Sequence, residues 1–444
     1  MNAFNQLLMD GALALSRASH FGMRIDMGYL RNKVGHVGKS IERSRRALLS
    51  TEEGKLWGKM SGEKLNLDSG PQLSALLFSR LGLKPVDVTE KGNPRTDDHS
   101  LKVLAKEAPF LTPLLAMRKE IKTLQYLELI QREQVDGFIH PAFNLHTVRT
   151  YRSSSNDPNF QNIPIRDPVQ GKAVRRCFVP RKGRRIVEMD FGGIEVRVAA
   201  CYHKDPAMLT YINDPTKDLH RDMAAECFRL PVDKVTKEIR YYGKNGFVFP
   251  AFYGSYWAQI APNLWDASDK LGLRPHLAAQ GLRTLAQFED HIKKVERRFW
   301  HERFPVYNRW KEKWWRQYLA RGYIDGLTGF RCTALMGRND CINYPIQGAA
   351  FHCLLWSFIR LDNFVLEHGL SQSLVGQIHD SIVMDAKPEE MEGLVSRTRR
   401  IIRKELPAEW KWIIVPLEVE TEVGGIDEPW NAKEKFITAE EEPA

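Results

Sequence analysis

The chain has 444 residues, with 65 Lys and Arg against 55 Asp and Glu, which gives a formal net charge of +10. This length exceeds one compact core, so two or three subdomains are expected. The positive charge favours a polyanionic partner, although a basic soluble protein without one would share it. The six cysteines form no Cys-x-x-Cys pair, which excludes a zinc ribbon, and no apolar run reaches the ~18 residues that span a bilayer.

In chain order, the sequence predicts helical parts around a mixed region. The first twenty residues are amphipathic and lack a signal-peptide layout, so they are expected to form an opening helix. Residues 28–145 are rich in helix-forming residues, and residues 209–325 are also mainly helix-like. Residues 146–208 and 326–444 alternate strand-like with helix-like segments. The pattern indicates an α+β protein.

Two aspartates occupy positions that would bring acidic groups together. Asp190 follows the apolar stretch RRIVEM and precedes the helix-like stretch GIEVRVAACY, so it is predicted at a strand end. Asp380 lies between SLVGQI and SIVMDA, which predict a hairpin. If the hairpin tip packs beside that strand end, the carboxylates could hold two Mg²⁺ ions about 4 Å apart for phosphoryl transfer. Taken alone, each aspartate would more often be a turn or cap residue.

Six motifs occur in one order along the chain. They are RSSSNDPNFQNIP (152–164), DFGGIE from Asp190, DLHRDMAAECFRLP from Asp218, RYYGK with FYG, NYPIQG from Asn343, and QIHD ending at Asp380. In this order they resemble the family A DNA polymerases, from about residue 21 to about residue 425. The resemblance implies a right-hand fold with a palm made of an antiparallel sheet plus helices, helical fingers and a helical thumb. Its parts would be a palm-associated segment (1–27), the thumb (28–145), the palm (146–208 and 326–444) and the fingers (209–325).

The resemblance also implies an activity and its partners. The chain would be a template-directed DNA polymerase that adds deoxynucleoside triphosphates to the primer 3′ end of primer–template DNA. It would use two Mg²⁺ ions, with Mn²⁺ as a substitute. No second cluster of acids precedes Asp190, so no 3′→5′ exonuclease is expected in this chain, and a separate exonuclease or replisome protein is a conceivable partner. The expected location is the cytoplasm of a bacterial cell or infected host, without a membrane, and the fingers look phage-like.

Site residues follow from matching these motifs position by position. The implied metal ligands are Asp190, Asp380 and the backbone carbonyl of Phe191. The implied nucleotide contacts are His220, Arg240, Lys244, Phe249, Tyr253 and the sugar-selecting Glu195. Lys244 would also be catalytic, as a proton donor to the leaving pyrophosphate. The implied DNA contacts are Arg152, Asn159, Gln161, Asn162, Asn343, Gln347 and His379.

The fingers helix departs from the family spacing. Lys244 and Tyr253 are nine residues apart, whereas family members have eight. A regular helix would place Val248 and Phe252 on the face of Lys244. One extra residue absorbed as a π-bulge would instead place Phe249 and Tyr253 there. We favour Phe249 as the residue that stacks on the nucleotide and Tyr253 as the residue that flanks the template, and the sequence leaves the other register open.

A second departure follows the hairpin aspartate. Many family A members have Glu directly after it, whereas this chain has Ser381. The string HDS resembles the related single-subunit RNA polymerases, which makes such an enzyme an alternative. Glu195 and the SSNDPNFQNIP loop favour the DNA-synthesising branch. A non-catalytic DNA-binding subunit is another alternative, which the intact aspartates and cations disfavour.

Overall fold

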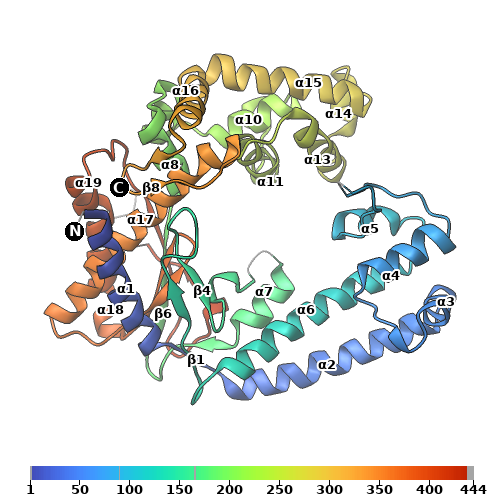
Figure 1. Cartoon of the computed structure of the whole chain (residues 1–444), viewed down its shortest axis with the longest axis horizontal. Coiled ribbons are helices and arrows are strands. Elements are labelled where there is room, and N and C mark those ends of the chain that lie inside the picture. The colour runs from blue at the N-terminus through green and yellow to red at the C-terminus, as the bar shows by residue number, and fades with distance from the viewer. Residues whose placement is uncertain (1–2, 90, 165–166, 438–444) are drawn as a thin grey trace.

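The computed structural model describes residues 3–89, 91–164 and 167–437 of the chain. A body that contains the main β-sheet carries two helical regions, which face each other across the molecule (Figure 1). One region contains α2 to α6, and the other contains α9 to α16. The predicted α+β class, with an antiparallel sheet and two helical extensions, is confirmed.

The main sheet places the strand of Asp190 at its centre. Its five antiparallel strands have the order β12-β11-β6-β10-β9. They are β6 (Arg185–Phe191), β9 (Leu374–Ile378), β10 (Ser381–Ala386), β11 (Val419–Val423) and β12 (Glu434–Lys435). β9 and β10 form the predicted hairpin, with Asp380 in the turn. Segments far apart in the sequence therefore fix the position of Asp190.

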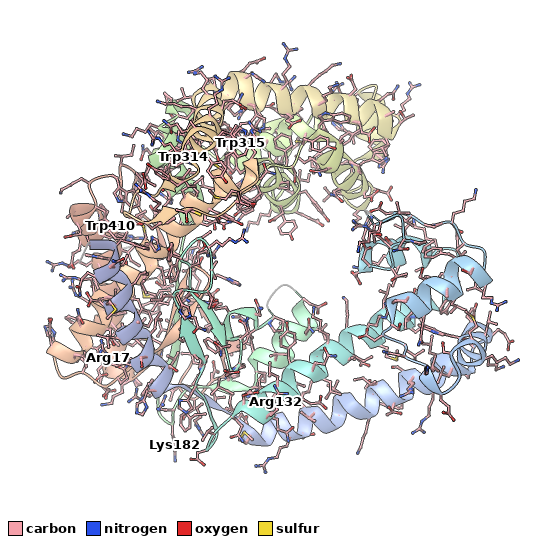
Figure 2. All side chains as sticks on the ribbon, in the orientation of Figure 1. Arg17, Arg132, Lys182, Trp314, Trp315 and Trp410 are labelled. Carbon is pink, nitrogen blue, oxygen red and sulfur yellow. The ribbon has the colours of Figure 1, made fainter. Side chains whose placement is uncertain are left out.

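One face of the sheet is covered by helices. Val187 and Met189 of β6 are fully buried on this face. The helices here are α1 (Ala3–Phe21), α8 (Ile194–His203), α17 (Arg338–Glu367), α18 (Pro388–Arg400) and α19 (Leu406–Glu409). α1 packs against α17, and Arg17 of α1 donates a 2.9 Å hydrogen bond to the buried carboxylate of Asp362 (Figure 2). The predicted opening helix thus belongs to the sheet body.

The opposite face carries Asp190. Side chains alternate along a strand, so Asp190 shares this face with Glu188 and Ile186. Ile186 packs there with Phe178 and Trp430. Smaller elements complete this side, namely β1 (Met23–Ile25), β2 (Phe138–Ile139), β3 (Ala142–Asn144), β4 (Ser154–Asn156), β5 (Phe178–Val179) and α7 (Pro168–Arg175). The acidic face is therefore supported by an apolar cluster at its far end.

The region predicted as the thumb is a helical arm with its own core. Its helices are α2 (Met27–Ser50), α3 (Glu52–Ser61), α4 (Gly70–Ser74), α5 (Asp98–Leu104) and α6 (Leu111–Glu133). α2 begins where the Asp26 side chain accepts a 2.9 Å hydrogen bond from the Tyr29 N–H. α2 and α6 pack along each other, and Trp57 and Leu111 are fully buried in the arm. Residues 138–144 of the predicted range differ, because they form strands paired with β1 and β4.

The region predicted as the fingers is helical and surrounds a second core. Its helices are α9 (Pro206–Asn213), α10 (Leu219–Phe228), α11 (Lys237–Tyr242), α12 (Phe249–Phe252), α13 (Trp257–Lys270), α14 (Arg274–Ala279), α15 (Leu285–Arg298) and α16 (Pro305–Arg321). A π-helical turn over Gly243–Val248 joins α11 to α12, so the proposed bulge is present. A Cβ at Gly243 would lie 2.4 Å from the His220 carbonyl oxygen, so only glycine permits this close approach to α10. The strands β7 (Ile324–Asp325) and β8 (Arg331–Cys332) then lead back to the body.

Among the described residues, one helix is long and apolar enough to cross a membrane by length and composition, namely α17. Most of its apolar window is buried inside the protein. It packs against α1, α8 and α16, so contacts within the fold account for its apolar residues.

Candidate active site

Asp190 and Asp380 lie side by side where β6 meets the β9–β10 turn. In the β6–β10 pair, Asp190 is opposite Ser381, the residue that follows Asp380. The Phe191 N–H donates a 3.0 Å hydrogen bond to the Asp380 carbonyl oxygen. His379 adopts a left-handed backbone conformation, with φ of 51°, which tightens the turn. The structure therefore brings together the two acids that the sequence predicted as a pair.

Both acids hold protons more tightly than an isolated aspartate. The surrounding protein reduces the solvation of Asp190, although its side chain reaches solvent, and this effect with the charges of Asp380 and Glu188 raises the pKa of Asp190 to about 7. Burial and the charge of Glu195 raise the pKa of Asp380 to about 6, whereas Arg152 opposes the shift. Each negative charge is therefore unfavourable here until a cation neutralises it.

This pair of acids fits a hard divalent cation such as Mg²⁺. Across the ranges that the structure describes, no three His, Cys, Asp or Glu side chains form a metal-binding group. Mg²⁺ does not need one, because water and substrate phosphates supply most of its ligands. Phe191 adjoins Asp190, with its side chain buried on the opposite face of the sheet. The expected metal contact of its carbonyl stays a prediction.

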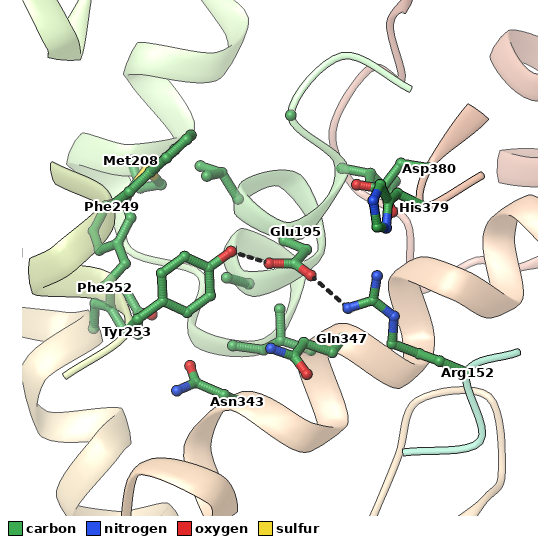
Figure 3. Close-up of a pocket in the computed structure, with 16 residues that line it drawn as sticks. Arg152, Glu195, Met208, Phe249, Phe252, Tyr253, Asn343, Gln347, His379 and Asp380 are labelled. Carbon is green, nitrogen blue, oxygen red and sulfur yellow. Dashed lines mark hydrogen bonds and ion pairs between the residues drawn. The ribbon is translucent and has the colours of Figure 1, made fainter. Parts of the chain in front are cut away.

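A pocket of about 350 Å³ opens beside the turn and gathers eight of the predicted site residues. These are Arg152, Glu195, Phe249, Tyr253, Asn343, Gln347, His379 and Asp380. They come from the loop before β4, from α8, from the end of the fingers helix, from α17 and from the β9–β10 turn, and Figure 3 shows them facing one space. The pocket therefore lies between the sheet body and the fingers.

Glu195 lies between two cleft residues (Figure 3). Its carboxylate accepts a hydrogen bond from the Tyr253 hydroxyl and a 3.4 Å hydrogen bond from Arg152 Nη1. Burial, together with the charge of Glu195, raises the pKa of the Tyr253 hydroxyl. Gly193 has φ of 62° and lets β6 turn sharply into α8, which directs Glu195 toward the pocket. Three predicted contact residues are thus linked to one another by hydrogen bonds.

The π-helical turn decides which fingers residues reach the pocket. Phe249 and Tyr253 line it, whereas Val248 is fully buried in the fingers core. Phe252, the partner of Val248 in the other register, lines the pocket as well and packs against Phe299 at a ring distance of 5.6 Å. The structure therefore places the favoured pair, Phe249 and Tyr253, at the pocket.

The predicted cations gather beside Phe249 rather than in the pocket lining. Lys244 Nζ is 5.1 Å from the centre of the Phe249 ring, and the His220 ring meets its edge at 5.6 Å. Arg240 Nε donates a 2.5 Å hydrogen bond to Asp218. Burial, and then the charges of Arg240 and Lys244, lowers the pKa of His220 to about 4. Its buried Nδ1 has no hydrogen-bond partner within the described part of the chain.

A second groove of about 490 Å³ adjoins the pocket and holds further predicted DNA contacts. Arg152 and Gln347 line both spaces, and Gln161 lines the groove. Gln161 Nε2 donates a 2.6 Å hydrogen bond to Ser153 Oγ, which holds the loop against the body. Asn343 is four residues before Gln347 on α17, so the two side chains share a helix face. Polar groups thus form a continuous line from the pocket into the groove.

Asn159 and Asn162 are used in local turn structure. Asn159 Oδ1 accepts a 3.2 Å hydrogen bond from the Asn162 N–H and caps the short helix Phe160–Asn162. Both side chains lie outside the pocket and outside the groove beside it. Their expected DNA contacts stay predictions.

Several residues of the site were missed in the sequence. Met208 and Tyr307 line the pocket but look like ordinary core residues in the chain. Asp218 holds Arg240, and its place at the start of the DLHRD motif, as a helix N-cap, could have identified it. Glu188 could have been identified from its spacing of two from Asp190, which puts both acids on one strand face.

Comparisons with known proteins agree with this geometry. A family model described as DNA polymerase family A matches residues 39–431. The DNA polymerase of Bacillus phage SP01 is 28% identical over 388 residues, 82% of this chain and 40% of that protein. The thermostable DNA polymerase I of Thermus aquaticus is 28% identical over 429 residues, 93% of this chain and 46% of that protein. The chain thus spans less than half the length of these curated relatives.

A solved structure is similar over almost the whole chain. It is the POL domain of Pol1 from M. smegmatis in complex with DNA primer-template and dNTP. The TM-score is 0.77 with 25% sequence identity, covering 96% of this chain and 70% of that one. The right-hand architecture that the motifs implied is therefore confirmed.

Proposed function

The chain belongs to DNA polymerase family A, and on this basis we propose that it is a DNA-directed DNA polymerase that extends a primer along a template. The observation that carries the proposal is the pairing of Asp190 and Asp380 beside a pocket that contains Glu195 and Phe249. Family membership implies a divalent-metal requirement. The substrates would be deoxynucleoside triphosphates and a primed DNA template.

Asp190 and Asp380 would hold two Mg²⁺ ions, for which Mn²⁺ could substitute, and the Phe191 carbonyl would add a ligand. Such ions, when bound, make the primer 3′-hydroxyl more acidic and neutralise charge on the triphosphate. Paired strands fix the backbone around both aspartates, so little reorganisation is needed when substrate arrives. The raised pKa values of both acids support cation binding, because a cation removes their mutual repulsion.

Arg240, Lys244 and His220 would bind the triphosphate. Positive charge at this point stabilises the negative charge that develops on the leaving pyrophosphate. Lys244 would donate a proton to that group, since an ammonium carries three donors. The contacts of Lys244 and His220 with the Phe249 ring support one shared site for these groups next to the nucleotide base.

Glu195 would select the sugar. Its side chain would occupy the space that a ribose 2′-hydroxyl requires, so deoxynucleotides fit and ribonucleotides clash. Phe249 would stack on the incoming base, and Tyr253, once released from Glu195, would flank the template. The two contacts of Glu195 support this role because they fix its carboxylate inside the pocket.

The primed DNA would lie along the groove beside the pocket. Arg152, Asn343, Gln347 and His379 carry donors that can reach minor-groove acceptors, which all correct base pairs share. Such contacts test pair geometry without reading sequence. The helical arm would grip the duplex backbone, and a separate exonuclease or replisome protein could act beside this chain in the cytoplasm.

Primer extension with Mg²⁺ tests the proposal. Wild type should incorporate deoxynucleotides, and Glu195→Ala should lose about 10²-fold of the preference over ribonucleotides. Tyr253→Phe removes only the hydrogen bond to Glu195 and should lose a smaller part of the sugar selection, because Arg152 still holds the carboxylate. Ribonucleotide synthesis by wild type would instead indicate an RNA polymerase-like enzyme. DNA binding without any synthesis would indicate a non-catalytic subunit.

A further inference from the structure

Ser381 connects the Asp380 turn to the strand of Asp190. Its hydroxyl has two acceptors, the Ile378 carbonyl oxygen at 3.0 Å and Glu188 Oε1 at 3.1 Å. Ile378 ends β9 on one side of the turn, and Ser381 begins β10 on the other. The side chain of this one residue therefore links both ends of the turn to β6.

Glu188 is itself held from three further directions. Its Oε2 accepts a 2.7 Å hydrogen bond from Trp430 Nε1 and another from Lys433 Nζ, and Arg175 Nη1 lies 3.8 Å away. Lys433 also donates to Glu422 of β11 at 2.8 Å. These partners come from α7 and from the segment after β11, so Glu188 joins three parts of the body.

A buried carboxylate with this many partners is rigid. Removing such a charge from water is unfavourable unless cations and donors replace the solvent, and here both do. The side chain of Glu188 is 13% exposed and that of Lys433 is 7% exposed. Glu188 lies two residues from Asp190, on the same face of the strand. Residues that hold the surroundings of a metal-binding side chain in this way fix the orientation of that side chain.

Given the proposed polymerase function, we propose that Glu188 is a positioning residue for the catalytic aspartates, acting through Ser381. It fixes the Asp380 turn against the Asp190 strand, so that both carboxylates face the same metal-binding space. In this chain a hydroxyl replaces the glutamate that many family members carry directly after the hairpin aspartate, and this hydroxyl bonds to a carboxylate of the neighbouring strand. Glu188 itself does not touch substrate.

A double-mutant cycle tests the link. Ser381→Ala and Glu188→Gln should each lower kcat about 10-fold, the low end for groups that orient metal ligands. Because they act through one contact, the double variant should also lose about 10-fold rather than the ~100-fold expected of independent sites. Ser381→Thr keeps the hydroxyl and should retain wild-type kcat. KM for nucleotide and Kd for primed DNA should stay within about twofold, since neither residue lines the pocket.

A second readout does not depend on turnover. Mn²⁺ binding to the protein alone, followed by electron paramagnetic resonance, should weaken about 10-fold in Ser381→Ala and remain normal in Ser381→Thr. Asp362→Asn is the control, because it breaks the ion pair between the buried Asp362 and the partly exposed Arg17 on the other side of the sheet, and it should lower Tm without changing kcat or Mn²⁺ affinity.

Multiplicative losses in the double variant, or unchanged kcat and Mn²⁺ affinity in Ser381→Ala, would overturn the proposal. If Glu188→Gln does not fold, the Ser381→Ala and Ser381→Thr pair decides by itself. A wild type that binds Mn²⁺ but never extends a primer would refute the polymerase function. In that case the Mn²⁺ comparison would still decide the role of Ser381 as a positioning contact.

Discussion

The palm and the fingers hold their proposed catalytic groups in different ways. Asp190 and Asp380 lie on paired strands, where backbone hydrogen bonds fix their positions. Arg240 and Lys244 stand on a helix that is interrupted by a π-helical turn, and the Arg240 side chain is 42% exposed. The acids of the palm are therefore held rigidly by the backbone, whereas the cations of the fingers stand on long side chains that can still change position. A change in the palm should remove chemistry, and a change in the fingers should weaken use of the nucleotide.

The largest effect should come from the palm. Asp380→Asn removes one of the two proposed metal-holding charges and should lower kcat by at least about 10³-fold, because a neutral amide stabilises a divalent cation much less than a carboxylate does. Single-turnover extension, with DNA binding measured separately, would check this. Primed DNA should still bind with wild-type affinity. Extension at near wild-type rate would show that Asp380 is not a metal ligand.

A smaller effect is expected from the cation beside Phe249. Lys244→Ala should lower kcat/KM for nucleotide by about 10²-fold, since it removes both charge and a proton donor from the leaving group. Lys244→Arg keeps the charge and should recover the affinity for nucleotide but not the full kcat. Wild-type activity of Lys244→Arg would show that charge alone matters. A loss confined to DNA affinity would contradict the assignment to the triphosphate.

Neighbouring positions in the fingers helix offer a matched pair. Phe249→Ala should raise KM for nucleotide about 10-fold, because a ring in the pocket is worth about 1–3 kcal/mol when it stacks on a base. Val248→Ala should instead cost about 2 kcal/mol of unfolding free energy, because its side chain is fully buried. Steady-state kinetics and urea unfolding separate these outcomes. A reversed pattern would mean that the helix has the other register.

The smallest expected effect is a pH dependence of the folding stability, which arises from the two aspartates of the palm. The folded-state pKa values of Asp190 and Asp380, about 7 and about 6, lie above the ordinary value of 3.8. An acid that binds its proton more tightly when folded loses stability as pH rises, so the metal-free protein should become less stable between about pH 4 and about pH 7. Asp190→Asn should flatten this slope, and Mg²⁺ should oppose it in wild type. Identical slopes for the two proteins in chelator would refute the shift.

Local patterns in the sequence were enough to predict the strand of Asp190 and the hairpin of Asp380. Alternating apolar residues and turn positions lie within a few residues of each aspartate, so no distant information was needed. The π-helical turn was also accessible, because the spacing of Lys244 and Tyr253 exceeded the family spacing by one residue. In each of these elements, the residues that determine the structure lie close together in the sequence.

The contacts that complete the site could not be predicted in the same way. The hydrogen bond from Tyr253 to Glu195 joins the fingers to α8, and the bond from Trp430 to Glu188 joins segments 242 residues apart. Both contacts depend on which strands and helices become neighbours in space, and local sequence patterns do not reveal that arrangement. From the sequence alone, Ser381 indicated only that a carboxylate was missing after Asp380. The pairing of β10 with β6 places the carboxylate of Glu188 next to the Ser381 hydroxyl.

The central position of β6 also has a consequence for synthesis of the protein. The helical arm is built from the continuous stretch between Met27 and Glu133, so its contacts are local and can form early on the ribosome. β6 must wait for both neighbours, β10 and then β11, which emerge only after the whole fingers region. A nascent chain released before β11 would contain the residues of the arm but lack the strand on one side of β6. The sheet around Asp190 is therefore completed only when the last part of the chain has been translated.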